Sequence, residues 1–240
     1  MNQKFTIIIP IYNENESIFK LIKEINVKLR NENPEIIIID DGSTDNFFKN
    51  FSAFNWPKNI SVQRHKKNSG KCYAMLTGIK RAKNEIIVCI DGDGQNPPSE
   101  IKKLMNAWYS FKNSSKTFLL VCGERIKRKD NFLKKVSSKL ANKFRKYLLN
   151  DQCNDTACAL KVFNKSDYLS IEYFKNMHRY LPALFIMQKG KIINVPVKDR
   201  PRESGKSKFN FHNRFWIGII DLIKVWILIN KKRGENDSYS

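Results

Sequence analysis

Short apolar runs alternate with helical stretches over the first half of the chain. Runs rich in isoleucine and valine, each bounded by polar turns, occur at residues 5–9, 35–39, 60–63, 85–90 and 118–122, which is typical of strands buried on both faces. Apolar residues recur three or four positions apart at about 16–29, 69–83 and 99–112, which predicts helices. The alternation predicts an α/β fold with a mostly parallel central sheet flanked by helices.

The second half of the chain has a less regular pattern. It predicts a basic helix at 130–149, a strand at 159–163, a helix at 177–189 and a strand at 191–197. A polar loop at 200–210 then precedes a helical segment at about 213–230. We therefore divide the chain into one domain at 1–212 and, at 213–240, an amphipathic helix with a basic tail.

Polar clusters follow four of the predicted strands, at residues 12–14, 40–43, 91–95 and 123–125. Ligands of parallel α/β sheets bind outside the carboxyl ends of the strands, and these ends share one edge. Four polar turns at that edge indicate a binding site. The chain carries no G-x-G-x-x-G motif, and residues 69–72 lack the first glycine and the Ser/Thr of a P-loop.

Asp91 and Asp93 flank a glycine directly after a buried strand. In extended chain, residues two apart point the same way, so both carboxylates can face one point. Two like charges held together favour a hard cation, Mg²⁺ or Mn²⁺, with Gln95 as a further oxygen ligand. The alternative is an Asp/Gly turn whose side chains cap the backbone or the next helix.

The ordered set of motifs resembles the inverting glycosyltransferases of family 2, which have the GT-A nucleotide-diphospho-sugar transferase fold. The matching stretches are 7–14 (IIIPIYNE), 39–45 (IDDGSTD), 68–71 (NSGK) and 91–95 (DGDGQ). Within the family the chain looks most like the dolichyl- and undecaprenyl-phosphate sugar transferases, such as dolichol-phosphate mannosyltransferase. That similarity continues through 121–125 (VCGER), 154–156 (NDT) and 202–208 (RESGKSK).

The resemblance implies a role for each matched residue. The residues implied to bind the donor nucleotide are Pro10, Tyr12, Glu14, Ile39, Asp41, Asp91 and Gly92. Asp93 and Gln95, with Asp91 beside them, would ligate the metal, and Arg125, Arg202 and Lys208 would hold the donor diphosphate and the acceptor phosphate. The implied catalytic residues are Asp93, Asp155 and Arg125.

Several of these residues have an alternative structural interpretation. Asp155 would position the acceptor or act as a weak base, because a polyprenyl phosphate is already anionic at neutral pH; helix capping is the alternative. Tyr12 and Ile39 fit packing at strand ends, and Arg202 and Lys208 fit a solvated loop. The matched motifs favour the functional interpretation of these four.

The chain has 44 Lys+Arg against 23 Asp+Glu, a formal net charge of +21. Such charge suits nucleic acid, an anionic membrane surface or a phosphorylated substrate. Residues 125–146 form a basic amphipathic pattern, which favours a surface for anionic lipid and for the acceptor phosphate over a merely solvated helix face. We expect no nucleic-acid partner, since acidic turns at the sheet edge would repel a phosphate backbone.

The C-terminal apolar run at 215–229 carries Asp221 and Lys224 in its middle and is shorter than the roughly 20 residues that a membrane span needs. It suits a helix in the membrane interface, with a core or dimer helix as the alternative. The N-terminus has no signal-peptide pattern. Five cysteines without a metal-type spacing indicate reduced thiols. We therefore expect a cytoplasmic protein, peripheral to the cytoplasmic face of the membrane.

These observations predict a metal-dependent, inverting transferase that moves one sugar from a nucleotide donor to a polyprenyl phosphate. The first alternative is the same fold acting on a hydroxyl acceptor of a glycan or glycolipid. The second is a basic nucleic-acid-binding protein without catalysis. The chain does not carry the Q-x-x-R-W signature of processive polysaccharide synthases.

Overall fold

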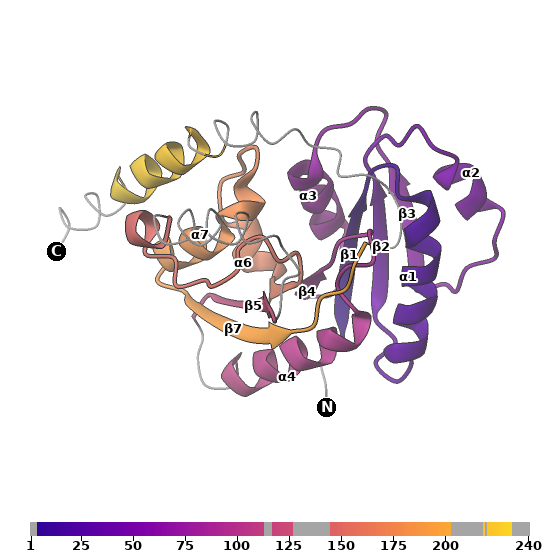
Figure 1. Ribbon diagram of the computed structural model, residues 1–240, viewed down its shortest axis with the longest axis horizontal. Coiled ribbons are helices and arrows are strands. Elements are labelled where there is room, and N and C mark those ends of the chain that lie inside the picture. The colour runs from indigo at the N-terminus through magenta and orange to yellow at the C-terminus, as the bar shows by residue number, and fades with distance from the viewer. Residues whose placement is uncertain (1–3, 113–116, 127–144, 203–217, 219, 232–240) are drawn as a thin grey trace.

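The computed structural model describes residues 4–112, 117–126, 145–202, 218 and 220–231 (Figure 1). A seven-stranded sheet in the order β3-β2-β1-β4-β6-β5-β7 forms its centre. The strands are β1 (Phe5–Ile11), β2 (Glu35–Asp40), β3 (Ile60–Arg64), β4 (Ile86–Cys89), β5 (Leu119–Arg125), β6 (Lys161–Asn164) and β7 (Lys191–Val197). Only β6 runs against its neighbours, so the predicted mostly parallel sheet is confirmed.

Helices cover both faces of this sheet (Figure 1). They are α1 (Asn15–Lys28), α2 (Phe47–Ser52), α3 (Lys71–Arg81), η1 (Pro98–Glu100), α4 (Ile101–Lys112), α6 (Lys165–Leu169), η2 (Met177–Arg179) and α7 (Leu181–Met187). Residues 145–149 and 220–231 are also helical. Apolar residues of α1 and α4 share one core with one face of β1 and β2, and those of α3 and α7 share a second core with the other face.

The structure differs from the predicted elements at three helices. The helices α2 and α6 were not predicted, because segments of six and five residues are too short to show a helical period. The helix predicted at 177–189 is instead a turn of 3₁₀ helix followed by α7, which begins at Leu181-Pro182. Most of the basic helix predicted at 130–149 lies outside the described residues, as does Lys208.

The C-terminal helix packs on the second core through Leu222, Val225 and Ile229, which are all buried. Two polar contacts fix its start: the Tyr180 hydroxyl donates to the carbonyl of Gly218 at 2.9 Å, and the Asn176 amide donates to Asp221 at 2.9 Å. Packing against the core therefore accounts for the apolar side chains on one face of this helix.

The other face of that helix exposes large apolar side chains, those of Ile220, Ile223, Trp226 and Ile227. The predicted amphipathic helix is thus present at 220–231. Within the described parts of the chain, every helix is too short or too polar to cross a bilayer.

Candidate functional site

The sheet topology brings six strand ends to one edge. The strands β1 to β4 are parallel, and β4 and β5 both run against β6, so the carboxyl ends of β1 to β5 lie on the same side. Because β7 is parallel to β5, the segment that follows Val197 also begins there. Chain segments from both halves of the protein therefore meet at this edge.

Arg202 joins the turn after β1 to the turn after β4. Its Nη2 lies 2.7 Å from a Glu14 carboxylate oxygen and 3.4 Å from an Asp93 oxygen. Asp93 is only 8 % exposed, and its second oxygen accepts the backbone N–H of Gln95 at 3.1 Å. Burial, and then the nearby charge of Asp91, raises the pKa of Asp93.

Asp91 makes a separate ion pair with the first residue of α3. The Nζ of Lys71 lies 2.5 Å from an Asp91 oxygen, and both side chains are about one-third exposed. The pair is therefore open to solvent on the side where a ligand would arrive. Sequence reasoning missed Lys71 as a site residue, although its position after Asn68, Ser69 and Gly70 marked a matched motif.

Asp41 anchors the loop that leads into α3. Its two oxygens accept the backbone N–H groups of Ser69, at 3.0 Å, and Gly70, at 2.7 Å. The ring Nδ1 of His65 lies 2.7 Å from the same carboxylate, and Nε2 lies 3.0 Å from the Thr77 hydroxyl. Asp41 is 3 % exposed, so in this structure it positions the loop that carries Lys71.

The remaining predicted donor-binding residues lie close along the same edge. Pro10 pairs with Ile39 across β1 and β2, and Tyr12 is half-buried just beyond the end of β1. Ile39 is fully buried in the core under α3. The structure brings these residues together, with Ile39 facing the core and Tyr12 partly open to solvent.

Gly92 sits where the β4 turn passes closest to β1. A Cβ atom added there would lie 2.4 Å from Cγ2 of Ile11. The Gly92 carbonyl also accepts the Ser17 hydroxyl of α1 at 2.8 Å. This close packing requires glycine and fixes the positions of Asp91 and Asp93 on either side.

Arg125 and Asp155 bind each other. The Nε and Nη2 atoms of Arg125 donate to the two Asp155 oxygens at 2.7 and 2.9 Å, and the side chains are 12 % and 10 % exposed. Burial opposes the charge of Arg125, but the hydrogen bond to Asp155, together with the negative charge of Asp155 and of neighbouring groups, outweighs it, so the pKa of Arg125 lies above its usual value. Both carboxylate oxygens of Asp155 are thus engaged by a guanidinium.

Arg145 of the predicted basic surface is buried rather than exposed. It pairs with Asp151 at 2.5 Å and donates to the carbonyl of Cys153 at 2.8 Å. Asp151 explains this difference, because a buried carboxylate loses its contacts with water and needs a positively charged partner, which Arg145 supplies. All five cysteines are buried thiols.

The acidic side chains at the edge fit a divalent cation. Asp91 and Asp93 offer hard oxygen ligands, and the raised pKa of Asp93 comes partly from the neighbouring charges of Asp91 and Glu14, which a cation would offset. No group of three or more His, Cys, Asp or Glu side chains in the described ranges is arranged as a complete metal site. Any ion bound here therefore needs further oxygens, which a diphosphate carries.

The sequence profile of Glycosyl transferase family 2 matches residues 6–170. The chain belongs to this family. It is 28 % identical over 236 residues to the dodecaprenyl-phosphate galacturonate synthase of Rhizobium johnstonii (strain DSM 114642 / LMG 32736 / 3841), a match that covers 95 % of this chain and 68 % of the relative. The chain is accordingly a glycosyltransferase.

Solved structures share the GT-A fold of this chain. Glucosyl-3-phosphoglycerate synthase from Mycobacterium tuberculosis, in complex with Mn²⁺, uridine diphosphate and phosphoglyceric acid, superposes with a TM-score of 0.69 at 15 % identity, covering 95 % of this chain and 78 % of that one. Mannosyl-3-phosphoglycerate synthase from Rubrobacter xylanophilus gives 0.63 at 10 % identity, covering 99 % and 76 %. These likenesses support the fold and carry no substrate over to this chain.

Proposed function

We propose that this glycosyltransferase moves one sugar from a nucleotide-sugar donor to a polyprenyl phosphate, with inversion and with a bound Mg²⁺ or Mn²⁺, at a membrane surface. The observation that carries the proposal is the meeting of Asp91, Asp93 and Glu14 with Lys71 and Arg202 at the carboxyl edge of the sheet. The name of the Rhizobium relative supports a polyprenyl-phosphate acceptor and makes galacturonate a candidate sugar.

The reaction joins an acceptor phosphate oxygen to the anomeric carbon and breaks the bond from that carbon to the donor diphosphate. Negative charge grows on the departing nucleoside diphosphate. A bound divalent ion supplies Lewis-acid stabilisation of that charge. Lys71 and Arg202 are the side chains that offer donors to the same oxygens, because both lie at the carboxylates where the ion would be held.

The acceptor side of the site needs little acid–base chemistry. A phosphate monoester is anionic at neutral pH, so its oxygen attacks without a strong base. We therefore assign Asp155 a positioning role: its carboxylate holds the guanidinium of Arg125, the last residue of β5. The exposed apolar face formed by Ile220, Ile223 and Ile227 supports approach to a lipid surface, where the acceptor resides.

Release of nucleoside diphosphate from purified protein tests the proposal. The assay supplies Mg²⁺ or Mn²⁺, undecaprenyl phosphate in detergent, and nucleotide-activated galacturonate, galactose, glucose or mannose in turn. We expect release with one donor, and only when metal and lipid phosphate are both present. Release that requires a hydroxyl acceptor instead, or no release with any donor, would contradict the proposal.

Asp93→Ala should remove this activity and leave the thermal transition nearly unchanged. The reason is that the charged Asp93 carboxylate is disfavoured by burial and by Asp91, so it adds little to the stability of the fold. The matched control is Glu16→Gln, which neutralises an exposed carboxylate in the first turn of α1 and should keep full turnover. If Asp93→Ala were as active as this control, Asp93 would not be part of the active site.

A further inference from the structure

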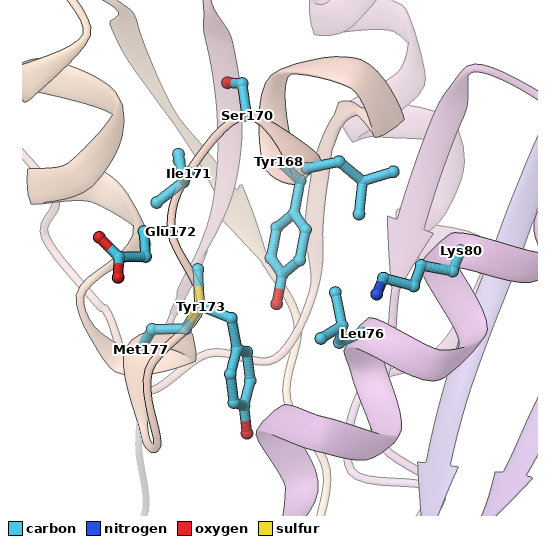
Figure 2. A pocket seen from close by; sticks show the side chains of 9 residues that line it. Leu76, Lys80, Tyr168, Ser170, Ile171, Glu172, Tyr173 and Met177 are labelled. Carbon is cyan, nitrogen blue, oxygen red and sulfur yellow. The ribbon is translucent and has the colours of Figure 1, made fainter.

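A cavity lies between α3 and the segment at 168–177 (Figure 2). Its volume is about 290 Å³, and its walls include Leu76, Tyr168, Ile171, Tyr173 and Met177. It starts about one and a half turns of α3 beyond Lys71. Its lining includes none of the residues that we assign to the donor site.

The floor of this cavity holds a buried hydroxyl without a partner. Tyr168 is 1 % exposed, and its hydroxyl has no hydrogen-bond partner among the described residues. Its ring stacks on Phe163 with centroids 5.3 Å apart, which restrains the direction of the hydroxyl. Figure 2 shows that hydroxyl pointing into the space beside Leu76. A buried polar group in this state needs a ligand or a bound water to satisfy it.

A cation reaches the same space from α3. Figure 2 shows the Lys80 ammonium directed toward the Tyr168 hydroxyl, and no carboxylate of the described residues lies within ion-pair distance of Lys80. The carboxylate of Glu172, which also borders the cavity, points away from both groups (Figure 2). Burial raises the pKa of Tyr168, so its hydroxyl keeps its proton and can donate.

We propose that this cavity binds a small amphipathic anion. Tyr168 and Lys80 hold its oxyanion head group, a carboxylate or a phosphate, and Leu76, Ile171 and Met177 contact its apolar body. The volume equals that of about ten water molecules, which fits a head group with a short hydrocarbon chain. This site is additional to the proposed sugar transfer and does not depend on it.

Calorimetric titration of the full chain with octanoate, octyl phosphate, octanol and inorganic phosphate tests this inference. We expect one molecule of octanoate or octyl phosphate to bind per chain, and the tighter of the two identifies the head group. Octanol and inorganic phosphate should bind at least about tenfold more weakly, because each lacks one half of the ligand. Octanol binding as tightly as the anions, or neither anion binding at millimolar concentration, would overturn the proposal.

Two variants place the ligand in the cavity. Tyr168→Phe and Lys80→Gln should each weaken anion binding about tenfold or more, because each removes a hydrogen bond to a charged group. The controls are Tyr147→Phe, at a position that is 86 % exposed, and Lys83→Gln, an exposed lysine just beyond α3. Affinity unchanged in both cavity variants would show that the anion binds elsewhere.

The stability of the ligand-free Tyr168→Phe protein gives an independent readout. Removing an unpartnered buried hydroxyl should leave the thermal transition unchanged or raise it, whereas removing a satisfied hydroxyl should lower it. A clearly lower transition would mean that the hydroxyl already has a partner, and would overturn its assignment to a ligand. The titrations contain no nucleotide sugar and no metal, so their failure leaves the proposed transfer reaction untouched.

Discussion

Replacing Asp155 by alanine should destabilise the protein by about 3 kcal/mol. Both Asp155 oxygens accept hydrogen bonds from Arg125, at 2.7 and 2.9 Å, and both side chains are about one-tenth exposed. Removing one partner of a buried pair costs about 3–5 kcal/mol, and the residual exposure places this pair at the low end. For a chain of this size, the thermal transition should fall by about 6–12 °C.

Urea unfolding of a double-mutant cycle measures the pair itself. Asp155→Ala and Arg125→Met should each lower the free energy of unfolding, and the double variant should lose less than the sum, with a coupling of about 2 kcal/mol. Glu16→Gln, at an exposed carboxylate, provides the unperturbed reference. A coupling near zero, or an Asp155→Ala protein of full stability without turnover, would refute the reasoning and make Asp155 a general base.

Three further changes test the fold and the site. Burial raises the pKa of Cys72 to about 11. The unfolded thiol therefore ionises first, and this thiol alone should cost about 2–3 kcal/mol of stability as the pH rises from 9 toward and past 11. Cys72→Ala should remove that share of the alkaline slope and leave the share that comes from other buried thiols such as Cys89. Gly92→Ala should cost about 1–3 kcal/mol and most of the turnover, because the new Cβ lies 2.4 Å from an isoleucine methyl. Ile223→Ser with Ile227→Ser should weaken binding to anionic vesicles about tenfold or more, since both side chains are about half exposed.

Each of these changes has a matched control. Burial raises the pKa of Cys158 less than that of Cys72, so Cys158→Ala should flatten the alkaline slope less than Cys72→Ala does. Gly218→Ala adds a Cβ that meets no atom of the described residues within 4 Å and should be neutral. Val27→Ser alters a side chain that is 72 % exposed on α1 and should not change vesicle binding. If a control variant changed the measured stability or vesicle binding as much as the variant that it matches, the physical reason given for that variant would be wrong.

The strands of the first half could be predicted because short isoleucine-rich runs such as 35–39, bounded by polar turns, rarely form anything other than a buried strand. The observed ends of these strands differ from the predicted ends, because pairing with the neighbouring strand, rather than composition, sets where a strand stops. For example, β1 continues to Ile11, which pairs with Asp40. Short elements gave no periodic signal, and Pro182 broke the helix expected across it. Long helices and buried strands are thus accessible to pattern reasoning, and elements of about one turn are not.

The sequence pattern placed the candidate residues at the carboxyl edge of the sheet, where the structure also brings them together, but it did not show their pairings. Sequence order places Arg202 188 positions from Glu14, and nothing in the spacing shows that they touch. The contact follows from the position of β7 beside β5, which only the three-dimensional strand order reveals. The motifs containing Lys71 and Asp91 were both visible, whereas the ion pair between them was not, because the position of α3 against β4 sets that distance.

The strand order also explains how a chain of net charge +21 holds an acidic site. Strand ends expose backbone N–H groups that can satisfy buried carboxylates: Ser43 donates to Asp40, Gly70 to Asp41 and Gln95 to Asp93. Basic side chains that the sequence places far away, such as Arg202, then enter the same edge from β7. The fold therefore sorts the charges locally, and net charge alone gives no guide to the sign of this site.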